Sequence, residues 1–231
     1  MNPLRQAIKF TMTGLLPRQK WLVNGPRSAN GIALTFDDGP HPEFTPRLLD
    51  ELQRQGVAAT FFVVGDAAAR YPELVRRMAV EGHAVGTHSY THSEPRQTCA
   101  KQLLNEVRRS LDLCGNLIGY EPTLFRPPKG QLTLAKTLGL WKLKQTVVLW
   151  NQDPRDYQGL SGIQSWLNQY QPRGGDIVLM HDIHPHCIAA IAPLVRLAEA
   201  RQLTEFVRVD QWIQKPKREV SDLELQSIQK T

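Results

Sequence analysis

Residues 31–40 read GIALTFDDGP, a run of mostly apolar residues that ends in two adjacent carboxylates and a Gly-Pro pair. The run 31–36 has the length and composition of a buried β-strand. Neither Asp37 nor Asp38 is comfortably buried without a partner, because moving an unpaired carboxylate out of water is costly. The segment therefore predicts a strand that delivers two acidic groups to the edge of a sheet.

The rest of the chain alternates between strand-like and helix-like stretches, with Gly, Pro and Asn at the joints. Further strands are predicted at residues 59–64, 83–87, 124–126, 145–150, 177–180 and 205–209. Helices are predicted at residues 46–55, 72–81, 96–117, 132–138, 162–170 and 187–201. About seven strands, each followed by a helix, indicate an α/β fold with a parallel sheet, either open or closed into a barrel. In both architectures functional residues gather at the carboxyl ends of the strands.

The composition is that of one globular domain. The chain has 231 residues, of which 41% are hydrophobic and 22% charged. A chain of this length and composition can form a hydrophobic core without disulfides or structural metal ions to stabilise it. No apolar run approaches the roughly 18 residues that span a bilayer. Three scattered cysteines without a Cys-x-x-Cys pair argue against a disulfide framework and are compatible with a reducing compartment.

The net charge of +6 is unevenly distributed. Residues 1–30 carry five basic and no acidic residues, residues 213–231 carry four basic and three acidic, and the 182 residues between them carry 19 of each sign. We therefore expect a basic N-terminal arm at 1–30, a neutral folded domain at 31–212 and a polar tail at 213–231. Because the basic excess is confined to the arm, nucleic acid is not an expected partner.

The arm also has a pattern. Its apolar residues fall at helical spacing, at Leu4, Ile8, Met12, Leu15 and Leu16. Such a stripe predicts either peripheral contact of residues 1–20 with an anionic membrane surface or packing of the arm against the domain. A cleaved signal peptide is disfavoured because Pro17, Arg18 and Lys20 stand where small residues belong. We expect a cytoplasmic protein, with peripheral contact at the inner membrane as the alternative.

Five predicted strands end in titratable or cationic groups. The segments are Asp37-Asp38, His88-Ser89-Tyr90-Thr91-His92, Arg126-Pro127-Pro128-Lys129-Gly130, Asp153-Pro154-Arg155-Asp156-Tyr157 and His181-Asp182. His88 and His92 are four residues apart, a spacing at which one helical turn places both imidazoles on the same side. The joint placement indicates one site at the carboxyl edge of the sheet.

Two imidazoles and one carboxylate make a three-ligand metal set that leaves positions open for water. Asp38, His88 and His92 would be that set. The same ligand types also hold non-heme iron in redox enzymes. The surplus of proton-transfer groups, namely Asp37, Asp156 and His181, favours hydrolysis over oxygen activation.

These segments, together with Leu179-Met180-His181, resemble the five ordered motifs of the polysaccharide deacetylase family, which is carbohydrate esterase family four with its chitooligosaccharide-deacetylase homology domain. The resemblance covers residues 31–210, most of the chain. It implies a distorted (β/α) barrel of about seven parallel strands. It also implies a metal-dependent hydrolase that removes N-acetyl groups from the amino sugars of a poly- or oligosaccharide.

The resemblance also implies a role for each matched residue. Asp37 would be the general base, His181 the general acid, and Asp38, His88 and His92 the metal ligands. Arg126 would hold Asp37, and Asp156 would tune His181. The substrate groove would include Pro128, Lys129, Tyr157 and Leu179, while Trp150, at a strand end, would be either a core residue or a wall for the acetyl group. Lys129 stands where the family usually has an aromatic residue and Tyr157 where it usually has Trp, which leaves the groove in question.

Three points stay open at this stage. Zinc is the expected metal, although these ligands are also compatible with cobalt, nickel or iron. The same residues would suit a deacetylase or deformylase of a lipid-linked sugar at the inner membrane face. A sugar-binding module without activity is the third hypothesis, and the presence of every motif residue argues against it.

Overall fold

The computed structural model describes residues 16–213. Its strands are β1 (Trp21–Leu22), β2 (Gly31–Asp37), β3 (Ala59–Val63), β4 (Ala84–Thr87), β5 (Leu124–Phe125), β6 (Thr146–Val148), β7 (Ile177–His181) and β8 (Glu205–Phe206). Its α-helices are α2 (Phe44–Gln55), α3 (Gly65–Arg70), α4 (Pro72–Val80), α5 (Ala100–Ile118), α6 (Leu134–Lys142), α7 (Leu160–Leu167) and α8 (His186–Glu199). Short 3-10 turns lie at Pro128–Gly130, Asp156–Gln158 and Val209–Trp212.

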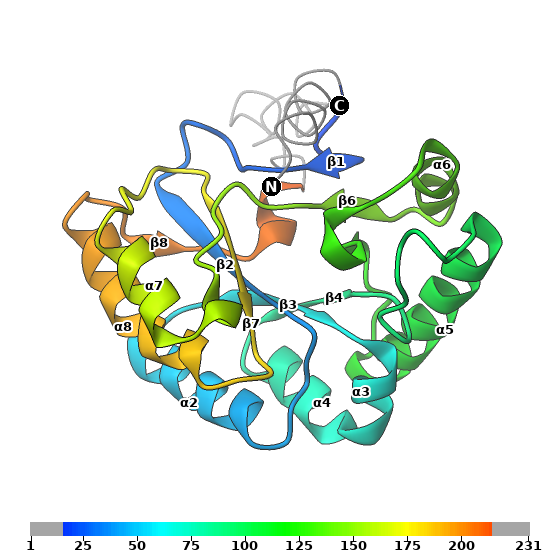
Figure 1. Cartoon of the computed structure of the whole chain (residues 1–231), viewed down its shortest axis with the longest axis horizontal. Coiled ribbons are helices and arrows are strands. Elements are labelled where there is room, and N and C mark those ends of the chain that lie inside the picture. Colours follow the sequence, from blue (N-terminus) through cyan, green and yellow to red (C-terminus); the bar gives the residue numbers. More distant parts are fainter. Residues whose placement is uncertain (1–15, 214–231) are drawn as a thin grey trace, which may run out of the picture.

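The strands form one curled parallel sheet. Its order is β1-β6-β5-β4-β3-β2-β7, and β8 pairs with β2 off this path. Figure 1 shows the helices arranged around the outer side of the curl. The seven strands of this path confirm the prediction of a distorted (β/α) barrel of parallel strands.

The strand alternation sorts side chains between the two faces of the sheet. In β2, Ile32, Leu34 and Phe36 face outward, where they join the large core cluster beneath the helices. Ala33 faces inward and packs with residues of β3, β5, β6 and β7 in a smaller cluster inside the curl. Thr35 and Asp37 follow on the same inner face, so the interior turns from apolar to polar toward the carboxyl end of the strand.

Two elements were not predicted. Strand β1 pairs in parallel with β6 through Trp21 and Leu22, inside the segment expected to be an arm. Strand β1 has two residues, too few for the alternation of apolar and polar side chains that identifies a strand. Helix α3 has six residues, too few for a helical repeat of apolar side chains. Three predicted strands, at 124–126, 145–150 and 205–209, are shorter in the structure, where they span Leu124–Phe125, Thr146–Val148 and Glu205–Phe206.

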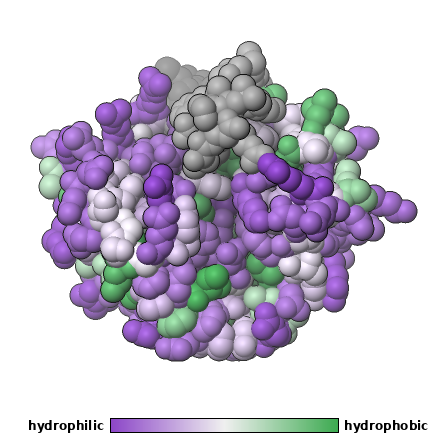
Figure 2. All heavy atoms as spheres, in the orientation of Figure 1, coloured by the Kyte–Doolittle hydropathy of each residue, from purple (hydrophilic) through white to green (hydrophobic). Residues whose placement is uncertain are grey.

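The N-terminal stripe lies almost entirely outside the described residues. Leu4, Ile8, Met12 and Leu15 fall in the undescribed segment, and Leu16 packs against the core cluster of β1, β5 and β6. None of the described helices is both long and apolar enough to cross a membrane. Figure 2 shows a mostly hydrophilic face on which apolar side chains form small, separate groups.

Candidate active site

The centre of the candidate site is an ion pair buried inside the curl of the sheet. Arg126 Nη1 donates to Asp37 Oδ1 at 2.8 Å, and the side chains of both residues are almost completely shielded from solvent. Asp37 ends β2, and Arg126 directly follows β5, so the pair links two strands that are not neighbours in the sheet. The pairing explains how a carboxylate and a guanidinium tolerate burial, since each supplies the opposite charge.

Arg126 is held by more than Asp37. The same Nη1 donates to Thr35 Oγ1 at 2.7 Å, and Nη2 donates to the Leu149 carbonyl at 3.1 Å. Its guanidinium carbon lies 4.2 Å from the centre of the Phe62 ring. These contacts fix the plane of the guanidinium, and through it the orientation of the Asp37 carboxylate.

Three side chains beside this pair form a candidate metal centre. Asp38 Oδ1 lies 3.3 Å from His92 Nε2 and 3.5 Å from His88 Nε2. This oxygen is buried and has no hydrogen-bond partner among the described residues, although a buried carboxylate oxygen normally has one. Two imidazole nitrogens and an orphaned oxygen facing one point are the donor set of a divalent cation. The residues therefore fit a metal.

The protonation of His88 suits a ligand. Its Nδ1 lies 2.7 Å from the backbone carbonyl of Arg126 and donates to it, which leaves Nε2 with a free lone pair. Burial lowers the pKa of His88 to about 3, against a smaller opposing effect of Asp38. The imidazole is thus neutral at physiological pH, as a metal ligand must be.

The two histidines converge, but not through the helical turn that their spacing predicted. Residues 88–92 form a loop in which Ser89 and His92 have left-handed backbone angles (φ 63° and 53°). The imidazole rings nevertheless lie 5.0 Å apart. The prediction of a helical turn was wrong because hydrogen bonds from outside the segment determine its path.

Glu106 supplies most of those hydrogen bonds. From helix α5 its carboxylate accepts the backbone N–H groups of Tyr90 and Thr91, at 3.2 and 3.1 Å, and the hydroxyls of Thr91 and Ser93. Within the loop, Ser89 Oγ accepts from the His92 backbone N–H at 3.1 Å. Sequence reasoning missed Glu106, since one carboxylate in an amphipathic helix resembles any solvent-facing residue.

On the other side of Asp37 lies a His–Asp pair. His181 is the register partner of Asp37 across β2 and β7, so the two side chains emerge on the same face. His181 Nδ1 donates to Asp156 Oδ1 at 2.8 Å, and its backbone N–H donates to Asp156 Oδ2 at 2.6 Å. Burial by itself lowers the pKa of His181, but the hydrogen bond and the charge of Asp156 outweigh it and raise this pKa to about 9.

Asp182 is a second residue that sequence reasoning left without a role. It is buried, accepts a hydrogen bond from Thr45 Oγ1 at 2.6 Å, and lies against the backbone of Gly39. A Cβ at Gly39 would lie 2.0 Å from the Asp182 carboxylate, so only glycine fits there. The contact packs the turn after Asp38 against the loop that carries His181.

The sequence profile described as "Polysaccharide deacetylase" matches residues 24–147, more than half of the chain. This chain belongs to the polysaccharide deacetylase family. A peptidoglycan-N-acetylglucosamine deacetylase of Bacillus cereus is 39% identical over 154 residues, which are 66% of this chain and 55% of that protein. A chitooligosaccharide deacetylase of Bradyrhizobium is 39% identical over 170 residues, 71% of this chain and 74% of that protein.

A solved structure agrees with the family assignment. The crystal structure of the Bc1960 peptidoglycan N-acetylglucosamine deacetylase has a TM-score of 0.82 and 27% identity, and covers 90% of this chain and 98% of that chain. The matched segment nevertheless spans only about half the length of the Bacillus cereus relative. None of these three proteins is named for a lipid-linked sugar.

The substrate residues expected from the polysaccharide deacetylase family fall into two groups. Lys129 and Tyr157 are exposed; the Lys129 ammonium pairs with Glu94, and the Tyr157 ring lies edge-on to the His181 ring at 6.0 Å. Pro128 and Leu179 are buried and Trp150 is half-buried, with Leu179 on the inner face of β7 between Ile177 and His181. The exposed group lies at the rim and the buried group inside it.

Replacing Arg126 tests how much the buried ion pair with Asp37 contributes to the stability of the protein. Arg126→Met leaves the Asp37 carboxylate buried without its partner, so we expect the free energy of unfolding to fall by about 3–5 kcal/mol in urea titrations. The double variant Arg126→Met/Asp37→Leu removes both charges, and most of the loss should return. A single variant within about 1 kcal/mol of the wild type would show that the pair is not needed to keep Asp37 in place.

Proposed function

We propose that the chain is a metal-dependent hydrolase that removes N-acetyl groups from the amino sugars of a poly- or oligosaccharide. One observation carries this proposal: the metal-ready set of Asp38, His88 and His92 adjoins a buried carboxylate, Asp37, whose register partner is the His181 of a His–Asp pair. Amide hydrolysis needs a polarised carbonyl, a deprotonated water and a protonated leaving amine. The arrangement provides one group for each requirement.

A divalent cation held by Asp38, His88 and His92 would polarise the amide carbonyl and lower the pKa of a water bound to it. The rest of the chemistry belongs to the side chains around that position. Asp37 takes the proton of the attacking water. The resemblance to the polysaccharide deacetylase family assigns the backbone N–H of Lys129 as a donor to the oxyanion. His181 gives its proton to the departing amine.

The electrostatics support this division of labour. Burial raises the pKa of Asp37, and the charges of Arg126 and His181 only partly offset the effect, which makes this carboxylate a stronger base than an exposed one. The raised pKa of His181 keeps its imidazole protonated at neutral pH. The proposed acid, His181, therefore carries its proton before substrate binds.

We propose a β-linked N-acetylglucosamine polymer or oligomer as substrate and zinc as the metal. Two relatives are named for peptidoglycan N-acetylglucosamine and one for chitooligosaccharide, which supports an N-acetylated amino sugar and leaves the polymer to experiment. Zinc accepts His and Asp ligands and keeps an open position without redox chemistry. The lipid-linked alternative has no support from these relatives and is not proposed.

The proposal is tested by measuring acetate released from chitooligosaccharides and from peptidoglycan fragments. The zinc-loaded protein should release acetate from at least one of them, and chelation should abolish release while a cooperative thermal transition remains, since the core is built without the ion. Acetate release that survives complete removal of metal, or none on either substrate class, would contradict the proposal.

Two neighbouring isosteric variants separate base from ligand. Asp37→Asn should reduce turnover by roughly a hundredfold to ten-thousandfold and keep the metal, because it removes the base only. Asp38→Asn should lose both turnover and metal. Metal content after equilibrium dialysis and initial rates are measured side by side. Loss of metal from Asp37→Asn would show that Asp37 is a ligand.

The pH profile tests the pair of His181 and Asp156. His181 acts in its protonated form. On the alkaline side, kcat/KM should therefore stay at its maximum below the pKa of His181 and fall as pH rises through about 9. Asp156→Asn removes the carboxylate that raises this pKa most, so the alkaline limb should move to lower pH by more than about one unit. Asp153→Asn, in the same loop, is the control and should keep the wild-type limb. If the alkaline limb of Asp156→Asn stayed at the wild-type pH, a group other than His181 would be responsible for it.

A further inference from the structure

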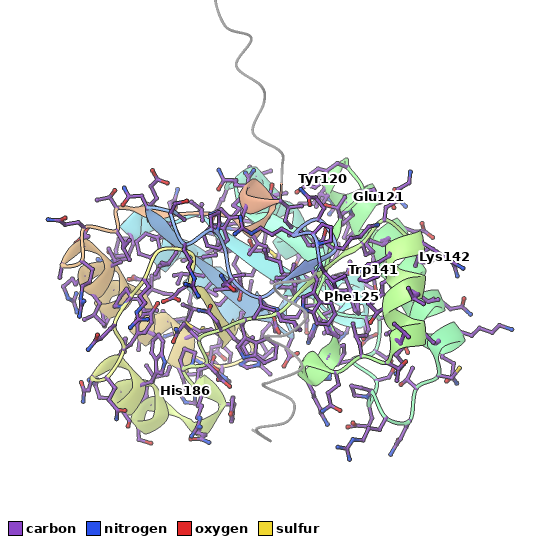
Figure 3. The ribbon with its side chains drawn as sticks, turned by 90° about the horizontal axis from the view of Figure 1, so that it is seen from above. Tyr120, Glu121, Phe125, Trp141, Lys142 and His186 are labelled. Carbon is purple, nitrogen blue, oxygen red and sulfur yellow. The ribbon has the colours of Figure 1, made fainter. Side chains whose placement is uncertain are left out.

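Three histidines lie within six residues, namely His181 at the end of β7, His184 in the loop and His186 at the start of α8. One ligand atom from each of Asp156, His181 and His184 lies within 4.8 Å of the others. This group shares no residue with the set of Asp38, His88 and His92. Figure 3 shows His186 beside α7, on the opposite side of the sheet from Trp141 and Lys142 of α6.

His184 lacks the hydrogen bonds that its position calls for. Both of its ring nitrogens are shielded from solvent, and neither has a hydrogen-bond partner among the described residues. A neutral imidazole carries one N–H and one lone pair, so two shielded nitrogens without a partner in one ring are unusual. The His184 ring lies tilted against the His186 ring, with ring centres 4.7 Å apart, and His186 Nδ1 donates to the Asp156 backbone carbonyl at 3.1 Å.

The distance between His184 and Asp156 fits a shared metal better than a hydrogen bond. His184 Nε2 lies 3.7 Å from Asp156 Oδ2, too far for a hydrogen bond. A zinc ion with bonds of about 2.0–2.2 Å to nitrogen and oxygen bridges two atoms at such a separation. Desolvation lowers the pKa of His184, so its nitrogen is available as a neutral ligand.

We propose that Asp156, His181 and His184 form a second divalent-cation site whose occupation stops the reaction. The ion binds His181 Nδ1 only after that nitrogen gives up its proton, so one proton is released and the hydrogen bond to Asp156 is broken. Nε2 keeps its proton, but a neutral imidazole bound to a cation gives up that proton far less readily than an imidazolium does, so the departing amine is left without its acid. The inhibitory consequence rests on the proposed role of His181, whereas the site itself rests on geometry alone.

Zinc alone is the probe. Bound zinc is counted by equilibrium dialysis of the full chain over a range of buffered free zinc, and initial rates are measured in the same buffers. The wild type should take up a first and then a weaker second ion. Its rate should fall with the second, by about tenfold at ten times the midpoint concentration.

His184→Ala should bind one ion only and keep its rate throughout the range. Ile183→Ala, at an exposed side chain between β7 and α8, is the control and should still bind two ions. A wild type that binds one ion over the whole range, or a His184→Ala variant that still binds two, would overturn the site. A second ion that leaves the rate unchanged would overturn the inhibition. If the protein shows no turnover at all, the proposed function fails, while the zinc counts still decide the second site.

Discussion

The ion pair of Arg126 and Asp37 is the constraint on which the rest of the site depends. Both side chains are buried inside the curl of the sheet, where neither charge is stable alone. Arg126 reaches Asp37 across the interior from β5, and its own backbone carbonyl accepts the Nδ1–H of His88. One residue thus orients both the proposed base and a proposed metal ligand. A change at Arg126 is expected to disturb both together.

The site separates its charges by placing them on different strands. Asp37 and His181 are register partners on β2 and β7, while the histidines of the metal set come from the loop after β4. Glu106 fixes that loop from α5, and Asp156 fixes His181 from the turn before α7. The environment pushes the pKa values of His88 and His181 in opposite directions, to about 3 and about 9. One imidazole is thereby suited to bind a cation and the other to carry a proton.

Much of this arrangement could be predicted from the sequence. The carboxyl ends of parallel strands meet at one edge of the sheet, so charged residues directly after apolar strands lie together there. The strand at Gly31–Asp37 and the convergence of Asp38, His88 and His92 follow from that rule. The path of residues 88–92 could not be predicted, since Glu106 determines it from another element through backbone contacts. Asp182 and His184 were equally hidden, because only their three-dimensional neighbours distinguish them from ordinary loop residues.

A crystal structure of the protein with one equivalent of zinc would show directly which carboxylate binds the ion. We expect a single ion on Asp38 Oδ1 and on Nε2 of His88 and His92, with Asp37 still paired to Arg126 and not bound to the metal. An ion ligated by Asp37, with Arg126 turned away from it, would show that Asp37 is a metal ligand and not a free base. The ion pair would then be a feature of the metal-free protein only, and another group would have to act as the base.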